Sequence, residues 1–351
     1  MDLVENMVKR VWHEIKGVEF SEPFKRMTYL KAMKTYGTDK PDTRFDLHIS
    51  DMTPFLNQSL MGQDCQVEAM VFKQGQSKVS KREWDDIKDR ILHDTFPHLG
   101  RTVNPSDLVF VQIKSTDLNW ISKLSHFLPD LDLTSEHPLR NLERGDVVVL
   151  NKRKAGYMGG CTILGQVRSH IGMLLDSKNL LPPGFHFLWV HSFPMFTPEW
   201  DHHGNRIGWS ATHHPFTAAI PEHASEIFKD PGRVLGQNYD LVVNGVELGG
   251  GSIRIHDARL QSLIFSRILG MSLTRIQRDF GHLLEALLHG CPPHGGLALG
   301  LDRWMSVLTE SASIRDVIAF PKMAGKDLMV ESPNRMEDLM LEPYHLQVFK
   351  K

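Results

Sequence analysis

The segment YDLVVNGVELGGGSIRIH, residues 239–256, constrains the fold of this chain more than any other part of its sequence. Its Asn244-Gly245 pair is the strongest short signal for a β-hairpin, because both residue types accept the positive φ angles of a type I′ turn. A loop of these two residues would pair Asp240 with Gly249 across the two strands. The sequence therefore predicts a two-stranded platform that carries acids, glycines and an arginine.

Two acids of this platform, Asp240 and Glu247, are predicted to share one face. They would lie on a cross-strand diagonal of roughly 7 Å, which is close enough for two carboxylates to share magnesium ions. Strict alternation of side chains would turn Arg254 to the opposite face from Glu247. A β-bulge within the glycine run that follows would bring Arg254 back to the face of the acids.

The glycine run, Gly249, Gly250 and Gly251, opposes strand formation, because glycine has no side chain to pack on the sheet. Its presence therefore needs another reason. We expect these residues to mark either the close approach of a ligand to the backbone or a bulge in the strand.

Composition predicts a soluble, globular protein. The 351 residues, 41% apolar and 23% charged, can bury a large core, and the length suggests two domains. A formal net charge of -2 gives no overall basic field, so contacts with nucleic acid would come from local patches.

Three isolated cysteines, Cys65, Cys161 and Cys291, form no CxxC pair and predict ordinary thiols in a reducing compartment. No apolar run approaches the ~20 residues that span a bilayer, so we expect no membrane partner.

Hydrophobic periodicity divides the chain into three parts and predicts an α+β fold. Apolar residues at helical spacing predict a packed helix from Leu3 to Ile15 that Gly17 ends. Farther along, short alternating strands around the charged helix Lys81–Leu92 predict an inserted α+β domain. The strand-like FHFLWVHSFPMF, residues 185–196, then returns the chain to an apolar environment. The three predicted parts are residues 1–57, the inserted domain at 58–158, and residues 159–351.

Two further segments carry residue types suited to ligand binding. In HHPFT, His213 and His214 precede a proline that favours extended backbone, so both imidazoles could face a ligand. No third ligand stands at zinc spacing, and a purely structural histidine pair stays open as the alternative. In GGLALGLDR, a glycine-rich strand turns into a helix at Asp302, whose N-terminus can face phosphate while Arg303 supplies a cation. A structural role stays open for this turn as well.

The common nucleotide-binding and hydrolase motifs are missing from the sequence. It contains no GxxxxGK[ST] loop, no GxGxxG that opens a βαβ unit and no GxSxG elbow. Parallel-sheet nucleotide folds and the α/β-hydrolase fold therefore lose support. The acids, the arginine and the glycine-rich strand instead favour a nucleotide bound over antiparallel strands.

Four segments in one order, HHPFT, NGVELGGGSIRIH, GGLALGLDR and SIRDVIAFPK, resemble the catalytic portion of bacterial-type aspartyl-tRNA synthetases. The loop GTDKPDTRF, residues 37–45, resembles the family segment that precedes an insertion domain, and the middle of the chain resembles that insertion domain. The resemblance therefore covers nearly the whole chain. It implies a class II fold, in which a mainly antiparallel sheet is flanked by helices and carries the inserted α+β domain.

The activity that this resemblance implies is that of an aspartate-tRNA ligase. Such an enzyme uses ATP to activate L-aspartate and transfers the aspartyl group to tRNA(Asp), and positioning with charge neutralisation supplies most of the rate. Carried over by motif position, the arginine fork would favour aspartate over asparagine. The implied aspartate-binding residues are His213, His214 and Arg254. The implied ATP-binding residues are Glu247, Gly300, Leu301, Asp302 and Arg303, with Asp240 and Glu247 as the Mg²⁺ ligands.

The chain also departs from the family pattern. The anticodon-binding β-barrel, the dimer-interface helix and strand, and the strand-loop-strand with an α-phosphate-binding arginine have no counterpart in it, and Ser192 stands where the family usually has aspartate. We therefore expect aspartate activation by the 351-residue chain to be near background. Two interpretations stay open: an aspartate-tRNA ligase whose sequence is incomplete at its start, or a truncated, catalytically inactive ATP-binding or regulatory fragment.

Compartment and assembly follow from the resemblance alone. The tripeptide PYH near the C-terminus is more similar to animal mitochondrial members than to bacterial ones. It favours the mitochondrial matrix over the bacterial cytoplasm. Full-length members of the family are expected to be homodimers.

Overall fold

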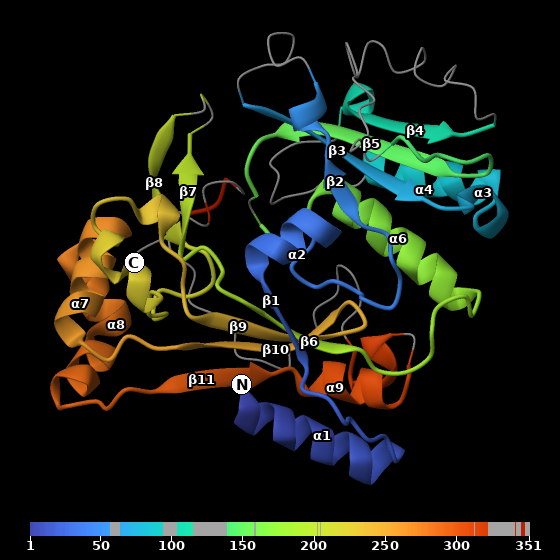
Figure 1. Ribbon diagram of the computed structural model, residues 1–351. Coiled ribbons are helices and arrows are strands. Elements are labelled where there is room, and N and C mark those ends of the chain that lie inside the picture. The colour runs from blue at the N-terminus through green and yellow to red at the C-terminus, as the bar shows by residue number, and fades with distance from the viewer. Residues whose placement is uncertain are drawn as a thin grey trace. The chain divides into compact units, whose positions relative to one another are not determined.

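The computed structural model describes residues 1–56, 64–93, 104–114, 139–157, 159–201, 203, 205–311, 313–321, 341 and 345–347. Two compact units make up the chain, Met1–Gly300 and Leu301–Lys351. Figure 1 shows the elements of the first unit and α9 of the second. None of the described helices is both long enough and apolar enough to cross a membrane.

A five-stranded, mainly antiparallel sheet in the first unit confirms the predicted α+β class, and it runs through the lower half of Figure 1. Its first two strands are parallel and the others pair antiparallel. The central strands are almost wholly buried, as their apolar sequences require. In spatial order the strands are β1 (Lys25–Thr28), β6 (Phe187–His191), β9 (Asn238–Val243), β10 (Val246–Ile253) and β11 (Gly295–Leu299).

The β9–β10 hairpin confirms the predicted turn and corrects its register. Asn244 and Gly245 have φ angles of 48° and 83°, as a type I′ turn requires. The register shifts between Glu247 and Gly249, so Asp240 lies opposite Gly250, and the predicted pairing with Gly249 is wrong. The bulge therefore falls just before the glycine run. Its predicted position within that run is wrong. Because the bulge adds one residue to β10, it still brings Arg254 to the face of the acids, which is the predicted effect.

Helices cover the sheet of the first unit. The predicted first helix is α1, and Gly17 ends it with a φ of 66° in the left-handed region. Its Trp12 is fully buried against the rings of Phe185 and Phe187, which docks α1 on β6. Among the described residues, the α-helices of this unit and its π-helical turn are α1 (Asp2–Lys16), α2 (Tyr29–Tyr36), α3 (Gly75–Lys78), α4 (Lys81–His93), α6 (Ile163–Ser177), α7 (Ala258–Leu263), the π-helical turn η7 (Ile264–Ile268) and α8 (Leu273–Leu288).

A second, four-stranded antiparallel sheet takes three of its strands from the residues of the predicted inserted domain and its edge strand β2 from residues before it. α4 and α6 share with this sheet one core that includes Trp84, Ile91 and Ile171. The predicted boundaries at 57/58 and 158/159 fall on residues 57, 58 and 158, outside the described part, and stay a prediction. In spatial order the strands are β2 (Ile49–Asp51), β3 (Cys65–Phe72), β5 (Val147–Lys154) and β4 (Leu108–Gln112).

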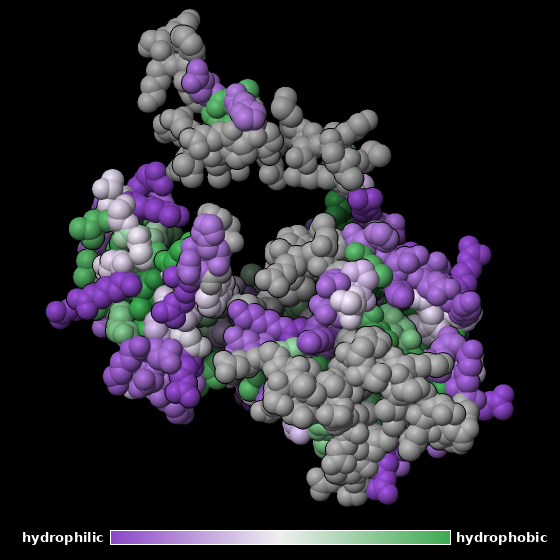
Figure 2. All heavy atoms as spheres, turned by 90° about the horizontal axis from the view of Figure 1, so that it is seen from above, coloured by the Kyte–Doolittle hydropathy of each residue, from purple (hydrophilic) through white to green (hydrophobic). Residues whose placement is uncertain are grey.

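The apolar segment at 185–196 is two strands rather than one. β6 ends at His191, and Ser192 takes a φ of 58°, which turns the chain out of the main sheet. β7 (Phe196–Trp200) then pairs with β8 (Arg206–Ala211) as a separate two-stranded sheet. The three cysteines are free thiols, as predicted. On the face seen in Figure 2, hydrophobic residues lie scattered among hydrophilic ones.

The second unit begins with α9 (Leu301–Leu308), one residue earlier than the helix start predicted at Asp302. A short 3₁₀ turn, Ile314–Asp316, follows, and Ser313 and Asp316 form a capping box at its start. The last residue of SIRDVIAFPK and the first two residues of PYH lie outside the described residues.

Candidate functional site

The acid pair predicted on the hairpin comes together over Gly250. A Cβ atom placed on Gly250 would lie 2.5 Å from Oδ1 of Asp240 and 3.4 Å from Oε1 of Glu247. Both carboxylates thus converge on one point above β10. Asp240 is 5% exposed, whereas Glu247 is partly exposed, so the pair opens to solvent on the side of Glu247.

The loop 37–45 adds two charged residues to this pair. Lys40 lies with its Nζ 3.3 Å from Oε2 of Glu247 and 3.5 Å from Oδ1 of Asp39. The loop is fixed at both ends, because Asp39 donates its backbone N–H to the carbonyl of Gly160 and Arg168 holds the stretch after residue 41. We call Asp39, Lys40, Asp240 and Glu247 the acid cluster.

Burial and like charge set the electrostatics of the acid cluster. Burial, with Glu247 nearby, raises the pKa of Asp240 to about 7. Burial also raises the pKa of Asp39. Burial alone would lower the pKa of Lys40, but Asp39 and Glu247 outweigh it and the pKa is raised. The cluster holds more negative charge than its single lysine compensates, which suits a cation ligand.

Asp240→Asn should become more stable than the parent chain as pH rises. The pKa of Asp240 is about 7 when folded and near 3.8 when unfolded, so between these values the folded chain binds more protons and its free energy of unfolding falls with pH. The variant lacks this loss, and its advantage at pH 8 should reach roughly a few kcal/mol. Urea denaturation in EDTA from pH 4 to 8 measures it. Asp85→Asn, at an exposed site on α4, is the control, and parallel profiles for both variants would contradict the expectation.

Arg254 and His214 form a second group farther along β10. Arg254 donates from Nη1 to the imidazole of His214, with 2.9 Å to Nδ1, and Ser252 Oγ lies 3.4 Å from Nε2 of the same ring. Burial and the neighbouring guanidinium lower the pKa of His214 to about 4, so the ring is neutral and accepts the hydrogen bond. Among the described residues, no carboxylate lies within ion-pairing distance of Arg254. Its fork is therefore open to an anionic ligand.

His213 and His214 lie in different surroundings, although they are adjacent in sequence. The ring of His213 packs edge-on against Phe193, 4.8 Å between centroids, and burial lowers its pKa while Glu247 opposes that shift. His213 thus lies on the side of the acid cluster and His214 on the side of Arg254. Gln261, which is fully buried, donates from Nε2 to the carbonyl of Pro215 at 2.8 Å and so fixes the turn that carries both histidines.

The three glycines of β10 serve two different neighbours. A Cβ on Gly249 would lie 2.4 Å from the carbonyl oxygen of Ala298, and a Cβ on Gly251 would lie 2.0 Å from that of Gly296. The absence of side chains at these two positions therefore allows the close approach of β11. Gly250 instead makes room for the carboxylates of the acid cluster. The backbone of β10 therefore has no space for side chains on either face at this point.

The residues predicted to bind ATP fall on both sides of the boundary between the units. Gly300 closes the first unit, and its N–H donates to the carbonyl of Leu248, the bulge residue, at 2.9 Å. Leu301, Asp302 and Arg303 form the first turn of α9 in the second unit, and their predicted role stays a prediction. In the part of the chain that the structure describes, no group of three or more His, Cys, Asp or Glu residues is arranged to hold a metal ion alone.

Sequence reasoning missed Asp39 and Lys40 as members of the site. The available signal was the charged loop GTDKPDTRF, which was predicted as a turn-rich loop and given no chemical role. A lysine and an aspartate in such a loop are ordinary surface residues until the fold places them beside Glu247, about 200 residues later in the chain.

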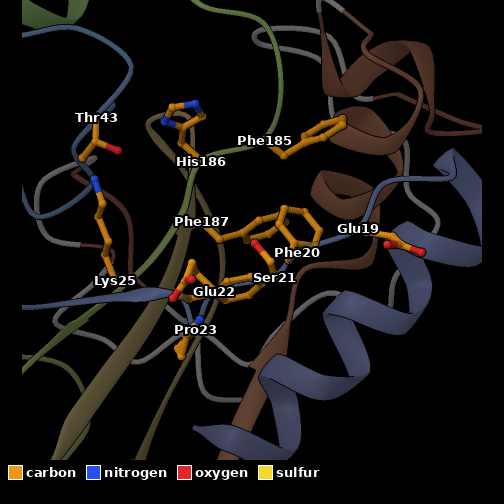
Figure 3. A pocket seen from close by; sticks show the side chains of 11 residues that line it. Glu19, Phe20, Ser21, Glu22, Pro23, Lys25, Thr43, Phe185, His186 and Phe187 are labelled. Carbon is orange, nitrogen blue, oxygen red and sulfur yellow. The ribbon is translucent and has the colours of Figure 1, made fainter.

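A cavity of about 260 Å³ lies elsewhere, between the α1–β1 connection and the start of β6 (Figure 3). Its aromatic residues pack against one another: Phe24 stacks on Phe187 with 4.6 Å between centroids, and Phe20 meets both rings edge-on. The rings thus serve as core contacts. We place the functional site at the acid cluster and Arg254, where charged groups converge.

The chain matches one family model and many curated proteins. Residues 1–324 match the family model described as tRNA synthetases class II (D, K and N), which confirms the resemblance carried by the four motifs. The chain is 35% identical over 98% of its length to the aspartate--tRNA(Asp/Asn) ligase of Opitutus terrae, of which it covers 57%. It is 39% identical over 94% of its length to the mitochondrial aspartate--tRNA ligase of Dictyostelium discoideum, of which it covers 49%. It thus spans about half the length of the curated relatives it matches.

Among solved structures, an asparaginyl-tRNA synthetase of Entamoeba histolytica in complex with asparaginyl-adenylate matches 93% of this chain and 43% of its own. The identity is 14% and the TM-score is 0.38.

Proposed function

The chain belongs to the class II tRNA synthetases (D, K and N), and we propose that its activity is that of an aspartate-tRNA ligase. The observation that carries the proposal is the open guanidinium of Arg254, which lies on the same face of β10 as the acid cluster. One face of one strand thus offers a fork for a carboxylate and a set of acids for a cation. Aspartate and magnesium-bound ATP need these two features side by side.

The aspartate subsite is assigned to Arg254, His214, His213 and Lys40. The fork of Arg254 takes the side-chain carboxylate of aspartate through two parallel hydrogen bonds, which asparagine cannot match because its amide carries a donor. Neutral His214 holds the fork in place. The ammonium of Lys40 lies at the acid cluster, where it can pair with a carboxylate of the substrate in exchange for Glu247.

Mg²⁺ fits the acid cluster by donor chemistry. Asp240 and Glu247 supply hard carboxylate oxygens on one side, and the remaining ligands would be phosphate oxygens and water, as is usual for this ion. Burial, together with the nearby charge of Glu247, raises the pKa of Asp240, and a bound cation would favour its ionised form. Bound there, Mg²⁺ would neutralise phosphate charge. ATP binding by Glu247, Gly300, Leu301, Asp302 and Arg303 belongs to the same proposal.

The proposed reaction has two steps. An oxygen of the aspartate α-carboxylate attacks the α-phosphorus of ATP, the bond to the β-phosphate oxygen breaks, and pyrophosphate leaves. A hydroxyl of the terminal ribose of tRNA(Asp) then attacks the activated carbonyl and releases AMP. The residues of the chain orient the carboxylate and balance charge, which is where such reactions gain most of their rate.

The test is aspartate binding, measured by calorimetry in the presence of Mg²⁺ and a nonhydrolysable ATP analogue. Arg254→Lys keeps the charge and loses the fork, so aspartate should bind roughly 30- to 150-fold more weakly, equivalent to about 2–3 kcal/mol, while asparagine changes little. Arg267→Lys, at an exposed position of η7, is the matched control. Equal affinity of the parent for aspartate and asparagine, or an Arg254→Lys variant with parental affinity, would overturn the proposal.

The partners and compartment are proposed with the activity. Mitochondrial and bacterial aspartate--tRNA ligases are both among the relatives, and we retain the mitochondrial matrix, with bacterial cytoplasm as the alternative. tRNA(Asp) and a homodimeric assembly complete the proposal. The alternative is an inactive ATP-binding or regulatory fragment. It is no better supported than the ligase, because the relatives are named as ligases.

A further inference from the structure

The β7–β8 hairpin carries a row of aromatic and cationic residues on one face. Trp200 pairs with Arg206 and Pro198 pairs with Trp209, and the register shifts between Glu199 and Trp200. Directly paired residues share a face, and so do residues two apart in a strand. Pro198, Trp200, Arg206 and Trp209 therefore face the same way.

Each indole of this row has a cation over it. The guanidinium of Arg206 lies 4.9 Å from the ring centroid of Trp209, and the ammonium of Lys154, from the end of β5, lies 5.1 Å from that of Trp200. Two indoles and two cations thus alternate along the surface. We call Lys154, Trp200, Arg206 and Trp209 the indole row.

The indole row is exposed in a way that core tryptophans are not. Trp200 is 45% exposed, and Arg206 and Lys154 are exposed as well. The hairpin forms a two-stranded sheet of its own (Figure 1), and the end of β5 reaches it through Lys154. Trp209 is anchored, because it packs against Gly232, where a Cβ would lie 2.8 Å from its ring. The row is therefore a fixed platform that keeps one large apolar ring accessible.

The two acids of the hairpin lie on its other face or bind within its turn. Glu199 pairs with Gly208 and lies on the opposite face of the strands. Asp201 uses its carboxylate within the turn, where it accepts from the backbone N–H groups of His203 and Asn205. The face of the indole row presents the cations of Lys154 and Arg206 beside flat aromatic surface.

We propose that the indole row binds single-stranded RNA. Bases stack on exposed aromatic rings regardless of their identity, and phosphates pair with lysine and arginine spaced between the rings. An acidic peptide would satisfy the two cations but has no planar groups for the indoles, so the row fits RNA better. The identity of that RNA as the single-stranded 3′ end of a tRNA rests on the proposed function.

The experiment measures binding of the 351-residue chain to a fluorescein-labelled, unstructured RNA octamer by anisotropy and by quenching of tryptophan fluorescence. Trp200→Ala should weaken binding roughly 5- to 150-fold, the range for loss of one stacked base. Lys154→Met and Arg206→Met should each reduce the slope of log K against log salt by about 0.7. Trp200→Phe keeps an aromatic ring at this position and should restore most of the affinity. Phe228→Ala, another exposed aromatic position, is the control and should bind as the parent does.

Three results would overturn the inference: Trp200→Ala and Arg206→Met bind as the parent does, Phe228→Ala loses as much affinity as Trp200→Ala, or an octamer of glutamate competes as well as the RNA. A tRNA transcript with and without its single-stranded 3′ end identifies the source, because removal of that end should abolish the effect of Trp200→Ala. Aspartate calorimetry on the same variants separates the two proposals. Trp200→Ala should lose RNA binding and keep aspartate binding. If the parent chain binds RNA but not aspartate, the ligase proposal fails and the RNA proposal stands.

Discussion

Gly251→Ala should destabilise the first unit by about 3 kcal/mol or more. A Cβ at this position would lie 2.0 Å from the carbonyl oxygen of Gly296 in β11, which is far inside contact distance. The obstacle is backbone, so no side chain can rotate away, and β10 and β11 would have to separate where they hydrogen-bond. Overpacking of a tight interior typically costs about 1–3 kcal/mol, and a clash with paired backbone belongs at the top of that range or above it.

Urea denaturation measures this effect as a shift in the free energy of unfolding. Gly208→Ala is the matched control, because Gly208 is also a strand glycine but its Cβ would meet its nearest atom, Oε2 of Glu199, at an ordinary 3.8 Å. The control should change stability by less than about 0.5 kcal/mol. A Gly251→Ala variant as stable as Gly208→Ala would show that β11 does not approach β10 as closely as the structure has it.

The same contacts explain which part of the hairpin could be predicted from the sequence. The Asn244-Gly245 turn depends on local backbone preference, which the two residue types carry with them wherever they occur. The position of the bulge depends on how β11, some 45 residues later, pairs with the glycine run, and no local pattern encodes that. The pairing of Asp240 was therefore predicted one residue away from its place.

The site shows the same division between local and long-range information. The acids and Arg254 lie within one hairpin, so their pattern could be interpreted as chemistry directly from the sequence. Lys40 reaches Glu247 only through the fold, and so does the contact of His214 with Arg254. The break at Ser192 was missed because apolar residues stand on both sides of it, whereas its positive φ is set by the turn between β6 and β7.

Arg168→Met should cost on the order of 3–5 kcal/mol, because several hydrogen bonds from a charged donor are lost together, each contributing about 1.5–3 kcal/mol. Arg168 is 2% exposed, and its guanidinium donates to three backbone carbonyls of the loop after Lys40: Leu47 at 2.7 Å, Asp42 at 2.8 Å and Phe45 at 3.0 Å. Burial lowers its pKa to about 10, so it remains charged at neutral pH. Without it, three backbone carbonyls lose a charged donor, and the ion pair of Arg44 with Asp176 remains as a side-chain contact between the loop and α6.

Comparison of two variants separates loss of packing from loss of hydrogen bonds. Methionine fills most of the space beside the rings of Phe45 and Tyr36, 4.0 and 4.8 Å from the guanidinium, but donates nothing. Lysine keeps a charge but has no planar fork, so Arg168→Lys should lose less stability than Arg168→Met. Both should lose more than the exposed control Arg10→Met, whose i,i+4 pair with Glu14 contributes little. Unfolding in urea ranks the three variants, and a loss for Arg168→Met no larger than for Arg10→Met would contradict the expectation.

The same loop places Lys40 at the acid cluster, so Arg168 should affect ligand binding without touching a ligand. In Arg168→Lys, at temperatures where the chain remains folded, aspartate should bind more weakly because Lys40 is no longer held beside Glu247. Amide hydrogen exchange of residues 42–47 should rise in parallel, since these backbone groups lose their anchor. Weaker aspartate binding with unchanged exchange in the loop would mean that Arg168 acts by another route, and faster exchange with unchanged affinity would mean that Lys40 does not contribute to the aspartate subsite.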